Sequence, residues 1–161
     1  MGVSGCGKST VAKAIADKLC YQFVEADDFH SIENREHMAQ GKPLNNKMRE
    51  PWIIALCDYL QYGAQQKVDC VMAFSGLQAE HRARFNQLGF ERITLFLDGK
   101  PELIQQRIEN RTNHYMPSSL LKSQYQSLQN PECEANTFKV NIDNDLSSII
   151  QQSLKLIETI I

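Results

Sequence analysis

The beginning of the chain carries residue types and a spacing that suit phosphate chemistry. Gly2, Gly7, Lys8 and Ser9 fit the pattern G-x-x-x-x-G-K-S/T, in which glycines let the backbone turn tightly and point several N–H groups at one place. Such a nest before a helix attracts the phosphates of a nucleotide, while the lysine brings a cation to the transferring group and the serine ligates Mg²⁺. The sequence therefore predicts a site for ATP and Mg²⁺ formed by Gly2, Val3, Ser4, Gly5, Cys6, Gly7, Lys8, Ser9 and Thr10.

Two further residues suit the binding of an acceptor molecule. Asp27 follows an apolar run at 22–26 that we expect to be a strand, and ligands of open α/β sheets bind beyond the carboxyl ends of strands. Its carboxylate is the candidate base for an acceptor hydroxyl, with a solvated loop acid or a helix N-cap as the alternative. Arg49 lies close to Trp52 and is suited either to clamping a substrate carboxylate or to a surface ion pair.

The elements that position these groups alternate along the chain. Apolar residues at helical spacing predict helices at 9–20, 120–128 and 146–161, and another that includes Trp52 and Leu60. Further helices are expected at 31–42, which is polar, and at 77–87 and 101–111. Apolar runs predict strands at 22–26, 68–75, 92–97 and 138–142. Pro43 and Pro51 are expected to bracket a turn. Alternating strands and helices indicate an α/β fold with a mostly parallel sheet, in a single domain spanning residues 1–161.

A pair of arginines and a polar segment add the features of a lid. Arg107 and Arg111 lie four residues apart and share one face of the helix expected at 101–111. The segment 112–118 that follows is polar, contains a proline and is expected to be mobile. Together they predict a small lid at about residues 107–120 that delivers positive charge to the phosphates and excludes water.

Bulk composition argues against several function classes. The net charge of −2 gives no general attraction to nucleic acid or an anionic membrane, and no stretch approaches the roughly 20 apolar residues of a membrane span. The five cysteines are widely spaced without a C-x-x-C pair, which argues against a zinc site or a disulfide framework. We therefore expect a cytoplasmic protein with a small-molecule partner, and neither nucleic acid nor membrane.

Several blocks of the sequence resemble those of bacterial gluconokinases. The middle blocks and the block at 114–131 are far more specific than the phosphate-binding loop, and all occur in the family's order along almost the whole chain. The blocks are GVSGCGKST at 2–10, EADDFH at 25–30, Asn34 with Met38, Gly41 and PLN at 43–45, Arg49 with Pro51 and Trp52, and HYMPSSLLKSQYQSLQNP at 114–131.

The resemblance implies a three-layer P-loop kinase fold akin to adenylate and shikimate kinases, usually as a homodimer. It also implies transfer of the ATP γ-phosphate to the 6-hydroxyl of D-gluconate. Combined with the motif, it makes Lys8, Asp27 and Arg111 the expected catalytic residues, with Arg107 and Arg111 near the nucleotide phosphates. The residues expected to contact the acceptor are Asp27, His30, Arg49, Gln78 and His114.

Four positions depart from the family pattern. The family usually has Asp where this chain has Asn46 and Met48, Lys where it has Gln78, and Tyr where it has His81. Losing a cation and two carboxylates from one edge of the cleft would weaken gluconate binding, change the acceptor, or leave a nucleotide-binding protein with little kinase activity. A kinase of another small sugar acid, or of a shikimate-like acceptor, is therefore an alternative. The intact phosphate-binding loop and candidate base favour an active kinase.

The strand that normally precedes a phosphate-binding loop is represented by Met1 alone. Burying the backbone groups that face such a gap costs on the order of 1–3 kcal/mol each. We therefore expect the central first strand to be truncated and the natural gene product to begin upstream. The alternative is a damaged, poorly active paralogue that starts at Met1.

Overall fold

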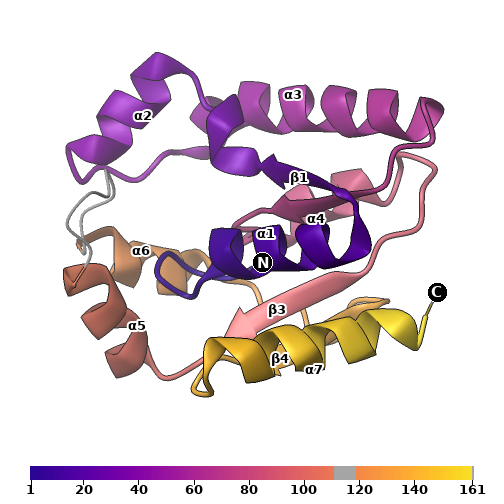
Figure 1. Cartoon of the computed structure of the whole chain (residues 1–161). Helices are drawn as coiled ribbons and strands as arrows, with labels where there is room; N and C mark the ends of the chain where they lie inside the picture. Colours follow the sequence, from indigo (N-terminus) through magenta and orange to yellow (C-terminus); the bar gives the residue numbers. More distant parts are fainter. Residues whose placement is uncertain (111–118, 161) are drawn as a thin grey trace.

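A computed structural model describes residues 1–110 and 119–160, which form helices around short parallel strands (Figure 1). The strands are β1 (Gln22–Glu25), β2 (Cys70–Ala73), β3 (Thr94–Asp98) and β4 (Thr137–Asn141). The helices are α1 (Lys8–Leu19), α2 (Ile32–Ala39), α3 (Asn46–Gln65), α4 (Ala79–Phe85), α5 (Pro101–Glu109), α6 (Ser119–Ser127) and α7 (Leu146–Glu158), with a 3-10 helix, η1, at Ala26–Phe29. Each strand and helix predicted from the sequence is present, although most bounds differ by a few residues.

The strands pair in two separate parallel sheets. β1 pairs with β2, with Gln22 opposite Cys70, and β3 pairs with β4, with Thr94 opposite Thr137. The predicted α/β class and the parallel pairing are therefore confirmed. The single sheet that we expected is divided, because β2 and β3 do not pair with each other in the described part of the chain.

The backbone of Met1 and Gly2 lies between the two sheets. The Met1 nitrogen donates to the Leu95 carbonyl at 2.5 Å, and the Met1 carbonyl accepts from the Leu97 N–H at 2.9 Å. Gly2 donates to the carbonyl of Ser75, just beyond β2, at 3.1 Å. Met1 thus forms one parallel pairing with β3, through its backbone nitrogen and its carbonyl. The upstream start expected from the sequence stays a prediction.

The main hydrophobic core holds α1 and α7 against the strands. Val11 and Ile15 of α1 and Ile149 of α7 are buried with Val140 of β4 in one cluster. Figure 1 shows α1 and α7 on the same side of the strands, and α1 packs on β1, β2 and α7. Since α1 starts at the phosphate-binding loop, this packing fixes the loop relative to both sheets. None of the helices in the described ranges is long and apolar enough to cross a membrane.

The long helix α3 starts before the position predicted for it. Asn45 caps the helix, because its side chain accepts from the Met48 N–H at 3.0 Å. Pro51 therefore lies inside α3. The prediction that a turn extends to Pro51 is wrong, because the helix has already begun at Asn46. The proline removes one backbone hydrogen bond, but the buried Trp52, with Ile53, Leu56 and Leu60, holds the helix against the second hydrophobic cluster.

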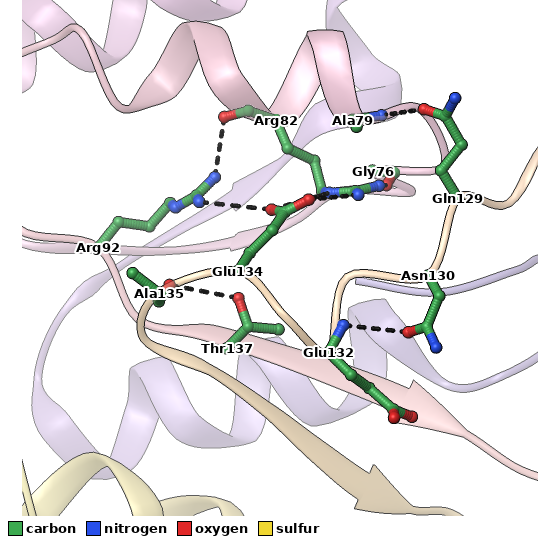
Figure 2. Close-up of polar contacts among 10 residues, drawn as sticks. All are labelled: Gly76, Ala79, Arg82, Arg92, Gln129, Asn130, Glu132, Glu134, Ala135 and Thr137. Carbon is green, nitrogen blue, oxygen red and sulfur yellow. Dashed lines mark hydrogen bonds and ion pairs between the residues drawn. The ribbon is translucent and has the colours of Figure 1, made fainter.

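An ion pair between a buried arginine and a partly buried glutamate fastens α4 to the segment that follows α6 (Figure 2). Arg82 is 2% exposed and binds both carboxylate oxygens of Glu134, through Nε at 2.9 and 3.1 Å and through Nη2. It also donates to the Gly76 carbonyl at 2.6 Å, while the Gln129 side chain accepts from the Ala79 N–H at 2.6 Å. These contacts position the turn between β2 and α4, which borders the site described next.

Candidate active site

The phosphate-binding loop leads into an open helix terminus. Gly7 has φ +98° at the N-cap of α1, and no side-chain cap occurs there among the described residues. A Cβ on Gly7 would meet no atom within 4 Å, whereas a Cβ on Gly2, at φ +140°, would lie 2.7 Å from the Leu97 carbonyl. Positive φ and close backbone approach therefore require glycine, and the uncapped N–H groups of α1 suit a phosphate.

Lys8 and Ser9 occupy the start of α1 as the motif predicts. Lys8 Nζ donates to the Val3 carbonyl at 3.0 Å, which places its charge across the loop. Ser9 hydrogen-bonds the side chain of Glu25, at the end of β1. Burial raises the pKa of Glu25, and the Ser9 hydrogen bond opposes this shift. The Ser9 hydroxyl and the Glu25 carboxylate are two oxygen ligands beside a phosphate site. This set suits Mg²⁺, which prefers carboxylate and hydroxyl oxygens together with phosphate.

Glu25 was not among the site residues predicted from the sequence. Its signal is its position at the carboxyl end of the strand that precedes Asp27, where ligands of parallel sheets bind. The contact with Ser9 joins residues 16 positions apart, which residue types alone do not reveal.

A pocket next to the loop brings together five of the predicted residues: Ser4, Lys8, Asp27, His30 and Arg49. Asp27 lies in η1, directly after β1, so its expected position beyond a strand is confirmed. The other lining residues come from the α2–α3 region, the turn after β2, and α6. They are Met38, Pro43, Leu44, Trp52, Ser75, Leu77, Leu120, Ser123, Gln124 and Ser127.

His30 forms one wall of this pocket by stacking on Trp52. The ring centroids are 4.1 Å apart with an interplanar angle of 21°, and Trp52 Nε1 donates to the Ala26 carbonyl at 2.7 Å. His30 is 7% exposed, and its Nδ1 is buried without a partner in the described ranges. Burial lowers the pKa of His30 to about 4, so the ring is neutral at pH 7.

This histidine should make folding stability depend on pH. The unfolded chain takes up the His30 proton near pH 6.5, whereas the folded chain does so near 4. The stability that neutral His30 contributes is therefore complete above pH 6.5 and is lost as the pH falls toward 4. Between pH 7.5 and 5.0, we expect the Tm of the parent to fall by roughly 2–5 °C more than that of His30→Gln. Equal falls in thermal melts of both proteins would contradict this.

Arg49 lines the same pocket as a half-buried cation. Burial lowers the pKa of its guanidinium. Its Nη1 makes a long hydrogen bond of 3.4 Å to Asn46 Oδ1, and no carboxylate forms an ion pair with it among residues 1–110 and 119–160. A desolvated guanidinium without a counter-ion is suited to an anionic ligand.

Gln78 and Arg107 make contacts other than those predicted from the sequence. Gln78 does not line the pocket and instead binds Asn46. Arg107 donates to the Ile142 carbonyl at 3.0 Å, which ties α5 to the segment after β4. Arg111 and His114 are outside the described residues, as is most of the expected lid.

The polar face of α6 is a part of the site that sequence reasoning missed. The Gln124 side-chain oxygen accepts from the Ser4 N–H in the loop at 2.6 Å, and Ser123 and Ser127 line the pocket beside it. Ser4 and Gln124 are 120 positions apart. Polar residues on one helix face are usually solvated, so only the fold identifies these as site residues.

Together, the parallel α/β fold, the glycine loop opening α1, and the Asp27 carboxylate in a small pocket of mixed polar and apolar lining define a P-loop kinase of small molecules. A family profile described as shikimate kinase matches residues 4–160. The chain belongs to this shikimate kinase family, among relatives that are gluconokinases.

Three relatives illustrate that kinship. A probable gluconokinase of Rattus norvegicus is 35% identical, over 98% of this chain and 95% of its own. The structure of a sugar kinase from Janibacter sp. HTCC2649 has a TM-score of 0.93 at 34% identity, covering 98% of this chain and 91% of that one. A gluconokinase from Sinorhizobium meliloti 1021 has a TM-score of 0.89 at 34% identity, covering 99% and 90%.

Proposed function

We propose that this protein transfers the γ-phosphate of ATP to the 6-hydroxyl of D-gluconate, forming 6-phosphogluconate. The observation that carries the proposal is Arg49, a half-buried guanidinium in the pocket of Asp27 with no carboxylate partner in the described residues. An acceptor that brings its own carboxylate satisfies this cation in a bidentate way. Gluconate is such an acid, and the relatives that carry its name support it.

The chemistry divides among the residues of the pocket and the loop. Asp27 takes the proton of the acceptor hydroxyl while the hydroxyl oxygen forms its bond to phosphorus and the bond to ADP breaks. Lys8 stabilises charge on the phosphoryl oxygens. ATP would supply the phosphoryl group, and Ser9 and Glu25 would hold a Mg²⁺ ion that neutralises phosphate charge.

The other roles rest on the pocket or on the resemblance. His30 and Arg49 would contact the acceptor, and Gln78 would act through Asn46. Arg111 as a catalytic residue, Arg107 and Arg111 near the phosphates, and His114 as an acceptor contact stay predictions from the resemblance, as does a lid at about 107–120.

A coupled assay of ADP release tests the proposed activity. The parent is offered D-gluconate, idonate, other aldonates and shikimate, and we expect turnover to be highest with gluconate. Turnover with another aldonate or with shikimate alone would identify a different acceptor. Stabilisation by ATP without turnover on any acid would indicate a nucleotide-binding protein instead of a kinase.

Asp27→Asn should lower kcat by about 100-fold or more, because the amide keeps the shape of the side chain and cannot accept the proton. The KM for ATP should change little, since Asp27 does not belong to the phosphate-binding loop. Asp28→Asn is the matched control, because Asp28 is the next residue and does not line this pocket. An unchanged kcat in Asp27→Asn, or a loss confined to ATP binding, would refute the role.

We also propose a single cytoplasmic kinase domain that assembles as a homodimer. All five cysteines, each within the described ranges, carry free thiols, which supports a reducing compartment. The homodimer rests on the resemblance alone, and light scattering coupled to size-exclusion chromatography measures it directly.

A further inference from the structure

We propose that Asn46 and Gln78 form a neutral amide pair that leaves the charge of Arg49 uncompensated, and so sets how strongly the site holds the carboxylate of its acceptor. The inference rests on the proposed function, because it concerns the acid group of the acceptor. It makes Asn46 and Gln78 positioning residues that act through Arg49, although neither lines the pocket.

A single oxygen atom joins the three side chains. Asn46 Oδ1 accepts from Gln78 Nε2 at 3.1 Å and from Arg49 Nη1 at 3.4 Å. Asn46 is the first residue of α3, and Gln78 is the N-cap of α4, so the pair bridges the starts of two helices. The guanidinium of Arg49 therefore contacts an amide dipole at the position where a carboxylate would form an ion pair.

The acidic residues nearest to this bridge are engaged in other contacts. Glu50 pairs with Arg84 at 2.8 Å. Glu80 accepts a long hydrogen bond from Asn46 Nδ2 at 3.4 Å and lies 3.5 Å from His81 Nε2. Asn46 thus lies between Glu80 and Arg49. Its amide nitrogen contacts the Glu80 carboxylate, and its amide oxygen contacts the Arg49 guanidinium.

The two positions should consequently have opposite effects on the acceptor. A carboxylate at position 46 would pair with Arg49 and compete with the acid group of gluconate. A cation at position 78 would neutralise that carboxylate and release Arg49 again. The buried Gln78 Oε1 has no partner in the described part of the chain, so exchanging this amide for an ammonium forfeits no hydrogen bond of that oxygen.

The test is a double-mutant cycle of Asn46→Asp, Gln78→Lys and the double variant. Quenching of Trp52, the only tryptophan and a lining residue of the pocket, reports the Kd for D-gluconate without turnover. The coupled assay gives kcat and KM. We expect Asn46→Asp to raise the Kd and the KM for gluconate about fivefold, with kcat and the KM for ATP within twofold. Gluconate binding by the double variant should return to within twofold of the parent.

Two controls separate charge at Arg49 from other causes. Lys47→Gln changes the net charge as Asn46→Asp does, at a neighbouring exposed residue, and should leave the Kd for gluconate unchanged. An aspartate at the first position of α3 favours the helix, so thermal melts should show Asn46→Asp folded. An unchanged Kd in Asn46→Asp, an equal shift in Lys47→Gln, or a double variant as weak as Asn46→Asp overturns the inference. If the parent itself binds no gluconate, the proposed function is refuted, and the inference that rests on it is refuted with it.

Discussion

Replacing Lys8 with alanine is expected to lower kcat by about 10³-fold or more, equivalent to roughly 4 kcal/mol of transition-state stabilisation. Lys8 is the only cation that the phosphate-binding loop supplies, and its Nζ already lies across the loop at Val3. Because the transferring phosphoryl group gains no other cation from this loop, neighbouring residues should not compensate. The coupled assay measures the loss with gluconate at saturating ATP.

Lys18→Ala is the matched control for this prediction. Lys18 is exposed in the last turn of the same helix, more than two turns from the loop. It should retain the parent kcat, and thermal melts should show that both variants are folded. Turnover of Lys8→Ala close to that of Lys18→Ala would show that the loop does not bind the transferring phosphate.

Removing the side chain of Arg82 is expected to destabilise the fold by about 3 kcal/mol, which lowers the Tm by roughly 6–12 °C. The guanidinium is 2% exposed and holds Glu134 and the Gly76 carbonyl at once (Figure 2). Among the described residues, Arg82→Ala leaves the carboxylate of Glu134 only the ion pair with Arg92, at 3.9 Å. Urea titration of the parent and the variant measures the change in free energy of unfolding.

The pair Arg84–Glu50 provides the comparison on the same helix. Both side chains are more than 40% exposed, so Arg84→Ala should cost less than about 1 kcal/mol. Equal losses in the two variants would mean that burial does not set the strength of the Arg82 pair.

Local patterns predicted the elements and the nucleotide half of the site. The glycine spacing before α1 and the position of Asp27 after β1 are short-range signals, because each joins residues that are neighbours in sequence. The start of α3 was predicted wrongly because of Pro51, since a proline usually interrupts a helix. Here the Asn45 cap and the buried Trp52 outweigh the one hydrogen bond that the proline removes.

The acceptor half of the site depends on contacts that residue patterns do not encode. Gln124 reaches Ser4 across 120 positions, and Gln78 reaches Asn46 across 32. A glutamine on a helix is unremarkable in sequence, and its role appears only when the fold places it against the loop. Arg107 is another example. Its spacing from Arg111 predicted a place near the phosphates, whereas its guanidinium donates to the Ile142 carbonyl, a contact that residue patterns do not encode.

The division of the strands into two pairs gives α1 a further property. This helix packs on β1 and β2, and its buried residues share a hydrophobic cluster with β3, β4 and α7. Local unfolding of either strand pair therefore exposes part of α1, so the two pairs are thermodynamically coupled through one helix. A ligand held at the first turn of α1 stabilises that helix and consequently makes the transient opening of both pairs rarer.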